Sequence, residues 1–322
     1  MEKEGKSMTI SGFTLANDKV DALYYPFIQS IQSILPIVDE FVVALDDKVG
    51  EVRKKLLALN SDKLRIIETS WDTEKFGDGT ILAQQTDIAK EHCTGDWLFY
   101  IQSDEVFHEK YLPIIKKRCE ELLHDKEVEG LLFRYRHFYG DYNHYLQSHG
   151  IYPKEIRVIR NRPDIHSWGD AQSFRRIPNF DKLNYRQKEG TYKLKVATVN
   201  AYMYHYGWTR PPRYMQNKRK NLHTVFKGEK KVAKIFENTE DVFDYGALGK
   251  LQKHKETHPQ VLHKRIAEFH WADQLNYGIK HTLNRPLHKH EKLKNRFLTK
   301  IENKLLGGDQ LFGYSNWKLL NR

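Results

Sequence analysis

Hydrophobic and polar positions follow two alternating patterns in the first third of the chain. Short apolar runs, rich in β-branched and aromatic residues, predict buried strands. Longer stretches with apolar residues at helical spacing separate these runs and predict amphipathic helices. The predicted strands are MTISGFTLA (8–16), EFVVALDD (40–47), LRIIETSW (64–71) and DWLFYIQSDEV (96–106), and the predicted helices span 24–38, 49–60, 80–95 and 110–125. This alternation predicts an α/β protein whose parallel strands are joined by right-handed crossovers.

The pattern changes near residue 130. Three runs combine apolar, aromatic and basic residues: GLLFRYRHFYG (130–140), EIRVIRN (155–161) and KLKVATVNAYMYHYGW (193–208). They predict an antiparallel or mixed extension of the sheet. After Pro211 and Pro212 the chain is basic and predicted to be mainly helical. Within 293–306, one helical face carries Leu293, Phe297, Ile301 and Leu305.

Composition supports a folded protein. Hydrophobic residues make up 39% and aromatic residues 12% of the 322 positions, which is enough for a core. Two cysteines, Cys93 and Cys119, are too few for a disulfide framework or a cysteine metal cluster, and they fit a reducing, cytoplasmic setting. No stretch approaches the ~20 apolar residues of a membrane span. The first segment has no secretory signal, and either Met1 or Met8 could be the native start.

Charge is distributed unevenly along the chain. The net charge is +11, yet residues 1–110 carry a net −8 and residues 111–322 a net +19. A basic surface attracts nucleic acid, anionic membranes or phosphorylated small molecules. The sign of the charge does not choose among these partners.

Acidic residues follow the predicted parallel strands. Asp46 and Asp47 end one run, and Asp104 and Glu105 end another. Ligands bind beyond the carboxyl ends of strands in such sheets, so these acids are expected at the binding edge. Carboxylates there suit Mg²⁺ or Mn²⁺ shared with substrate phosphates. The alternative is that they cap helices or begin turns.

The order of these segments, with EFVVALDD second, LRIIETSW third and DWLFYIQSDE fourth, resembles the inverting family 2 nucleotide-sugar glycosyltransferases of the GT-A fold. The resemblance covers about residues 8–210. It implies a Rossmann-like GT-A fold, with a mostly parallel central sheet flanked by helices. The resemblance implies a glycosyltransferase domain at 1–210, followed by a helical basic region at 211–322. Within the domain, residues 8–110 would bind the nucleotide and residues 111–210 would bind the acceptor.

The resemblance also implies a metal site. In the family the fourth strand ends in a DXD motif that holds a metal ion on the donor diphosphate. The corresponding residues here are Gln102, Ser103 and Asp104, followed by Glu105. Gln102 replaces the first acid, and Asp104 keeps the second. Mn²⁺ or Mg²⁺ is therefore expected at Asp104, with Glu105 and the late His205 of YMYHYGW as further ligands.

Donor-binding residues follow from the same resemblance. The nucleotide is expected across the ends of the first two strands. The helix TILAQQTDIA is expected to supply a polar contact to it, from either Gln85 or Asp87. Basic residues after the last predicted strand suit the charge on the leaving diphosphate. The expected donor-binding residues are Thr14, Ala16, Asp46, Asp47, Gln85, Ser103, Arg213 and Lys218.

An inverting transfer needs a base for the acceptor hydroxyl, which the family supplies as a carboxylate after the metal strand. In HSWGDAQSFRR (166–176) that residue is expected to be Asp170, with Asp164 as the alternative. Asp170 could instead cap a helix. The expected activity is sugar transfer to an acceptor hydroxyl on a glycan or a lipid-linked saccharide.

Other functions remain open at this point. The pI of 9.3 and the segment FRYRHFYG are compatible with nucleic-acid binding, although no known recognition motif supports it. A catalytically inactive nucleotide-sugar-binding homologue is a second alternative. A nucleotidyltransferase would need a glycine-rich basic loop, which GFTLANDKVDALYY lacks. The basic C-terminal region could also touch an anionic membrane, at the inner face of the cell membrane.

Overall fold

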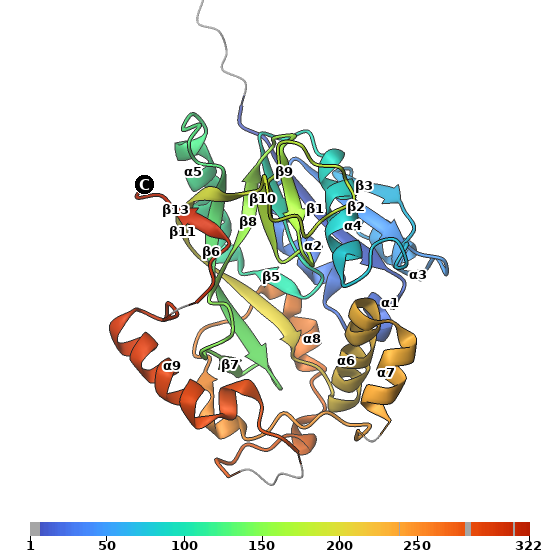
Figure 1. Cartoon of the computed structure of the whole chain (residues 1–322), viewed down its shortest axis with the longest axis vertical. Coiled ribbons are helices and arrows are strands. Elements are labelled where there is room, and N and C mark those ends of the chain that lie inside the picture. Colours follow the sequence, from blue (N-terminus) through green and yellow to red (C-terminus); the bar gives the residue numbers. More distant parts are fainter. Residues whose placement is uncertain (1–6, 238, 281–284, 312) are drawn as a thin grey trace, which may run out of the picture.

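The first four strands form a parallel sheet. The computed structural model describes residues 7–237, 239–280, 285–311 and 313–322. The strands are β1 (Ile10–Asn17), β2 (Glu40–Asp46), β3 (Leu64–Glu68) and β4 (Trp97–Tyr100), in the order β3-β2-β1-β4 and all parallel. This is the order of a Rossmann-type half and is consistent with a GT-A fold (Figure 1). The predicted α/β class is confirmed.

Helices cover both faces of this half. The buried apolar residues of α2 and α3 belong to one hydrophobic cluster, and those of α4, which packs on β1 and β2, belong to others. In α2, Phe27, Ile31 and Ile34 recur at helical spacing and are buried in the main core. The helices are α1 (Lys19–Ala22), α2 (Phe27–Ile34), α3 (Glu51–Leu57), α4 (Thr80–Glu91) and α5 (Leu112–Leu122). Each helix longer than one turn lies within its predicted range.

The second half of the sheet is mixed, as expected. β4 pairs antiparallel with β8 (Lys154–Arg160), β8 pairs antiparallel with β6 (Gly130–Tyr139), and β6 runs parallel to the long β11 (Tyr192–Trp208). The sheet as a whole is therefore parallel only in part. The remaining strands of this half are β5 (Glu105–Phe107), β7 (His144–Leu146), β9 (Ile165–Trp168), β10 (Ser173–Arg176) and β12 (Gln252–Lys253).

The run predicted as one strand at 96–106 is interrupted. β4 ends at Tyr100, and a turn closes where the amide of Glu105 donates to the carbonyl of Gln102 at 3.0 Å. The chain then enters β5, which runs antiparallel to β11 and pairs Glu105 with His205. The prediction of a continuous strand is wrong at 101–104. The turn carries Asp104 to the edge of the sheet beside β11.

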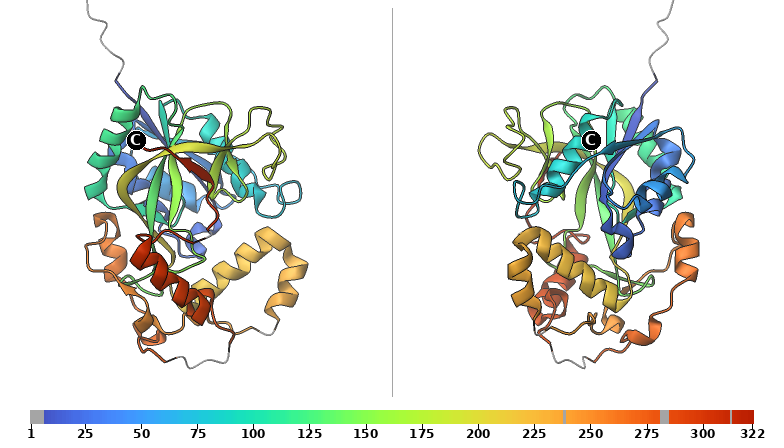
Figure 2. Two further views of the ribbon diagram at one scale, coloured as in Figure 1. Left: turned by 60° about the vertical axis from the view of Figure 1, so that its left-hand side comes forward. Right: turned by 90° about the vertical axis from the view of Figure 1, so that its right-hand side faces the viewer.

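The C-terminal part wraps below the sheet and then returns to it (Figures 1 and 2). β13 (Trp317–Leu319) pairs with β11, so the end of the chain extends the same sheet. No helix in the described part of the chain is both long and apolar enough to cross a membrane. The helices are α6 (Pro212–Lys227), α7 (Glu229–Phe236), α8 (His263–Ala267) and α9 (Leu293–Leu305), and short 3₁₀ turns lie at Leu35–Ile37, Glu109–Tyr111, Leu248–Lys250, Gln260–Leu262, Ala272–Gln274 and Lys289–Glu291.

Candidate active site

A pocket of about 370 Å³ opens at the carboxyl ends of β1 and β4. Its walls come from the end of β1, the turn after β4, the loop between β9 and β10, the end of β11 and one side of α6. Six residues predicted from the sequence line it: Ala16, Ser103, Asp104, Asp170, His205 and Lys218. Residues from five segments of the chain therefore converge on one site.

Asp104 lies at the centre of the polar wall. Its Oδ2 is 3.0 Å from Nζ of Lys218 and 3.6 Å from Nε2 of His205. Burial alone would raise the pKa of Asp104, but Lys218 and His205 hold it well below its usual range. Burial lowers the pKa of Lys218 to about 8, although Asp104 opposes the shift. Asp104 is therefore an anion beside the ammonium group of Lys218, in a largely buried position.

The space beside Asp104 depends on a glycine. A Cβ at Gly207 would lie 2.5 Å from Nε2 of His205 and 2.6 Å from Oδ2 of Asp104. Real Cβ atoms do not approach other atoms so closely. The absence of a side chain at position 207 keeps both of these atoms accessible.

A hydrogen-bond chain fixes the orientation of His205. The carbonyl of Tyr152 lies 2.8 Å from Nε2 of His137 and must accept its proton. Nδ1 of His137, 3.0 Å from Nδ1 of His205, is then the acceptor in the next bond. Burial lowers the pKa of His137 to about 3, so the ring is neutral. Nδ1 of His205 is the donor in the bond with His137, so Nε2 is the ring nitrogen of His205 on the side of Asp104.

Glu105 has a different environment from Asp104. It is fully buried, and Arg157 donates to both of its oxygens at 2.8 and 2.7 Å. The hydroxyl of Tyr135 donates to Oε1 at 2.7 Å, and the amide of Gln102 donates to Oε2 at 3.0 Å. Both oxygens are engaged away from the pocket, which favours a structural role as the counter-ion of Arg157.

Gln102, which occupies the place of the first motif acid, holds the opposite loop. Its Nε2 donates to the carbonyl of Ala171 at 3.1 Å. Arg157 donates to the next carbonyl, that of Gln172, at 2.8 Å. Ala171 also adopts a positive φ of 62°, so the backbone here is held in an unusual turn. Together these contacts fix the loop that carries Asp170.

Asp170 itself is half-buried and lines the pocket. Its side chain makes no hydrogen bond or ion pair with any residue that the structure describes. The alternative Asp164 pairs instead with Arg162 at 2.8 Å. Of the two predicted carboxylates, Asp170 is the one that faces the pocket with its oxygens available.

Five other predicted residues do not line the pocket. Asp47 accepts from the amides of Gly50 and Arg53 at the start of α3, as a capping residue does. Asp46 accepts from the amide of Trp71, a pocket residue, at 3.0 Å. Thr14 donates to the carbonyl of Ile101. Gln85 is buried and donates to the carbonyl of Ser70, and Arg213 is exposed. Asp87, the second candidate on α4, binds His166 and the amide of Ser167.

Sequence reasoning missed several residues around Asp104. Tyr25 lines the pocket, and Nζ of Lys218 lies 5.0 Å from the centre of its ring. Arg210 is fully buried over the same ring, and its Nε and Nη2 have no hydrogen-bond partner among the described residues. His137 reaches His205 only because β6 and β11 pair in register. No local pattern marks these residues, because each contact depends on the folded sheet.

The donor set fits a divalent cation in part. Among the described residues, no three His, Cys, Asp or Glu side chains form a metal-binding group. Asp104 and His205 form a pair, 3.6 Å apart without a direct hydrogen bond, beside the space that Gly207 leaves open. Mg²⁺ and similar ions often use few protein ligands and complete their shells with water and phosphate. The pair is compatible with such an ion.

The fold and the pocket define a Rossmann-like α/β protein with a polar site at the carboxyl edge of its parallel strands. The structure resembles glucosyl-3-phosphoglycerate synthase from Mycobacterium tuberculosis in complex with Mn²⁺, UDP and glucosyl-3-phosphoglycerate, with a TM-score of 0.28 and 20% identity over 41% of this chain and 44% of that chain. It also resembles TarS 1–349 from S. aureus, with a TM-score of 0.37 and 12% identity over 68% of this chain and 65% of that chain. No protein-family model and no curated protein matches the sequence. Both likenesses are distant, as the TM-scores of 0.28 and 0.37 show.

Proposed function

We propose that the protein is a glycosyltransferase that moves a sugar from a nucleotide-diphosphate donor to an acceptor hydroxyl. One observation carries the proposal. A single pocket at the carboxyl edge of the parallel strands contains the Asp104–His205 pair, the cation of Lys218 and the unpartnered carboxylate of Asp170. These are the groups needed to hold a diphosphate and to accept a proton on the other side of the reacting bond.

The donor diphosphate would lie beside Asp104. Asp104 and His205 would hold Mn²⁺ or Mg²⁺, and the bound ion would supply positive charge to the leaving diphosphate. Lys218 and Arg219, on adjacent positions of α6, line the same pocket and add charge there. Lys218 can exchange its contact with Asp104 for one with a phosphate oxygen, because its ammonium already lies in the pocket.

The nucleoside would lie over the end of β1. Ala16 and Ser103 line this side, where small side chains leave room for a ring. Trp71, whose amide is held by Asp46, forms an aromatic wall at the same end. Asp46 would therefore act by positioning Trp71.

Asp170 would act as the base. A carboxylate opposite the leaving group takes the proton of the acceptor hydroxyl as that oxygen attacks the anomeric carbon, which inverts the configuration. The contacts of Gln102 and Arg157 with the neighbouring carbonyls keep the loop in place without using the Asp170 oxygens. The acceptor would be a glycan or lipid-linked saccharide hydroxyl.

A thermal-shift panel of sugar nucleotides, with and without Mn²⁺, tests donor binding. At least one sugar nucleotide is expected to raise Tm with Mn²⁺ present. With that donor, Asp170→Asn should leave the Tm shift unchanged while turnover falls by about 10²–10⁴-fold, as expected when a general base is lost. Asp164→Asn serves as the matched control and should keep turnover. Full activity of Asp170→Asn would remove it as the base, and a panel without any stabilisation, alongside tight RNA binding, would favour the nucleic-acid alternative.

A further inference from the structure

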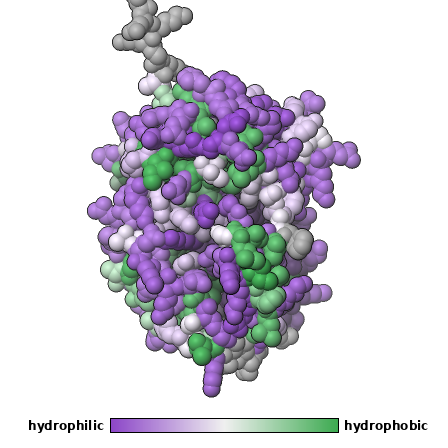
Figure 3. Space-filling model, turned by 90° about the vertical axis from the view of Figure 1, so that its left-hand side faces the viewer, coloured by the Kyte–Doolittle hydropathy of each residue, from purple (hydrophilic) through white to green (hydrophobic). Residues whose placement is uncertain are grey.

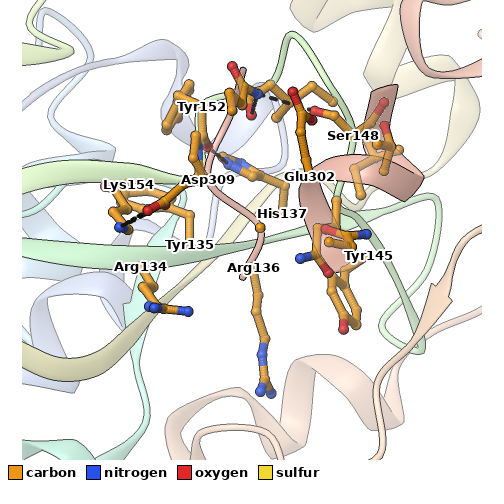
Figure 4. Close-up of a pocket in the computed structure, with 18 of the residues that line it drawn as sticks. Arg134, Tyr135, Arg136, His137, Tyr145, Ser148, Tyr152, Lys154, Glu302 and Asp309 are labelled. Atoms are coloured by element: carbon orange, nitrogen blue, oxygen red, sulfur yellow. Dashed lines mark hydrogen bonds and ion pairs between the residues drawn. The ribbon is translucent and has the colours of Figure 1, made fainter. Parts of the chain in front are cut away.

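The helix α9 turns its polar side towards the rest of the protein. Glu302, which is 3% exposed, binds Nδ1 of His149 at 2.6 Å and accepts from the amide of Leu311 at 2.9 Å. The hydroxyl of Thr299 accepts from the amide of His149 at 2.8 Å. Figure 4 shows Glu302 on α9 facing the side chains of a small pocket, of about 100 Å³, between this helix and β6. Polar contacts therefore attach this side of α9 to the rest of the protein.

The apolar side of α9 faces outward. Leu293, Phe297 and Leu305 are 79%, 65% and 71% exposed. Leu293 and Phe297 lie at positions i and i+4, on one side of the helix and away from Glu302, and Leu305 is the last residue of the helix. Figure 3 views the molecule from the side on which α9 lies and shows hydrophobic side chains gathered there among hydrophilic ones. A helix of a water-soluble protein normally has the opposite orientation, so this face is suited to an apolar neighbour.

Cations accompany the exposed apolar residues. Lys292, Lys294, Lys300 and Lys304 are exposed, and none forms an ion pair with a residue that the structure describes. Glu302 is the only acid in the sequence of α9, and it is buried. The outer face of α9 is therefore both apolar and positively charged.

We propose that the outer face of α9 docks on an anionic lipid bilayer. Apolar side chains between lysines are the pattern of helices that lie in the plane of a membrane interface, with the apolar residues in the acyl region and the lysines near acidic headgroups. This proposal goes beyond the transfer reaction and does not depend on it.

A second copy of the chain fits this face less well. A two-fold contact would bring the same patch against itself, because such interfaces are isologous. The lysines of one copy would then meet those of the other without an acid on the outer face of α9 to compensate. An anionic surface supplies the missing opposite charge.

Vesicle co-sedimentation of the full chain tests the proposal. Wild-type protein is expected to bind vesicles of phosphatidylcholine mixed with phosphatidylglycerol, and to bind pure phosphatidylcholine much more weakly. The double variant Phe297→Glu with Leu305→Glu should bind the mixed vesicles at least about a hundredfold more weakly, because it lacks two apolar side chains that would enter the bilayer. Lys300→Glu with Lys304→Glu should also weaken binding, roughly tenfold or more, while keeping the apolar residues.

Leu57→Glu is the matched control, since Leu57 is 62% exposed on another basic helix, α3. It should bind vesicles as wild type does. Sedimentation velocity on the same proteins measures association between copies. The proposal is overturned if wild type ignores the anionic vesicles, if both α9 variants bind unchanged, or if wild type is a dimer that the Phe297→Glu and Leu305→Glu changes dissociate. Because the donor-binding panel uses no vesicles, failure here leaves the proposed transfer reaction testable on its own.

Discussion

At the residue scale, Gly207 controls access to the pair Asp104 and His205. Replacing Gly207 by Ala places a methyl group 2.5 Å from Nε2 of His205 and 2.6 Å from Oδ2 of Asp104, in the space proposed for an ion or a phosphate oxygen. Gly207→Ala is therefore expected to weaken Mn²⁺-dependent donor binding by at least about tenfold, a loss of 1.4 kcal/mol or more. Calorimetric titration with the donor measures this change.

Gly77→Ala is the control for that variant. Gly77 is near the same edge, and a Cβ there would come no closer than 4.0 Å to another residue. It should bind donor as wild type does. Equal affinities for Gly207→Ala and wild type would contradict the placement of the ion and diphosphate beside Asp104.

A variant of Glu105 offers a second test at this scale, because it distinguishes the role of counter-ion to Arg157 from the role of metal ligand. Glu105→Ala would leave the fully buried Arg157 without its counter-ion. The free energy of unfolding should fall by about 3–5 kcal/mol, as when one partner of a buried ion pair is removed. Urea denaturation measures it, and adding Arg157→Met should recover part of the loss. A variant of unchanged stability that had lost only Mn²⁺ affinity would instead show that Glu105 is a ligand.

Individual residues were predictable where their position in the strand order identifies them. Asp104 follows the fourth strand and lines the pocket at the carboxyl ends of β1 and β4. The role of Glu105 was not predictable, because its partner Arg157 is 52 residues away and is brought close by the pairing of β4 with β8. Asp47 shows a second difficulty, since an acid after a strand can either face a ligand or cap the next helix. Asp47 caps α3, and the local sequence fits both roles equally well.

At the element scale, the turn after β4 and the loop after β9 are joined by Gln102. The bond from Gln102 to the carbonyl of Ala171 fixes the segment that carries Asp170. Gln102→Ala should therefore lower kcat by about tenfold, in line with the loss of one hydrogen bond, while donor affinity changes less than about twofold. Steady-state kinetics together with donor titration measure both quantities.

The outcome of that experiment distinguishes two roles for Gln102. A fall in donor affinity with unchanged kcat would show that Gln102 contacts the nucleotide directly. Gln102→Glu is a useful second variant. Its carboxylate restores an acid at this position but cannot donate a hydrogen bond to the carbonyl of Ala171. It should show the same loss of kcat as Gln102→Ala.

Elements with strong local patterns were predicted from the sequence, and those that depend on distant pairing were not. The parallel strands and the longer helices of the first half follow from alternation of apolar runs and helical spacing. The break at 101–104 escaped prediction because β5 is defined by its pairing with β11, about 100 residues later. The helix α9 was predicted from its apolar positions, but the helix period does not tell which of them face outward: Leu293, Phe297 and Leu305 are exposed, and Ile301 is half-buried.

At the scale of the whole molecule, the site lies where two oppositely charged parts of the chain meet. The acidic first 110 residues supply Asp104, and the basic remainder supplies Lys218 and Arg219 from α6. The sequence predicts the charge asymmetry but not this contact. The pairing of β13 with β11 was likewise unpredictable, because a three-residue strand carries almost no periodic signal.

The central claim is that the pocket around Asp104 binds a nucleoside diphosphate together with a divalent cation. Isothermal titration calorimetry of the full chain with nucleoside diphosphates in Mn²⁺ tests it most directly. At least one nucleoside diphosphate is expected to bind, and Asp104→Asn or removal of Mn²⁺ with a chelator should each weaken that binding by about tenfold or more. Absence of binding by every nucleoside diphosphate, or binding that is equally tight in Asp104→Asn and without Mn²⁺, would contradict the account.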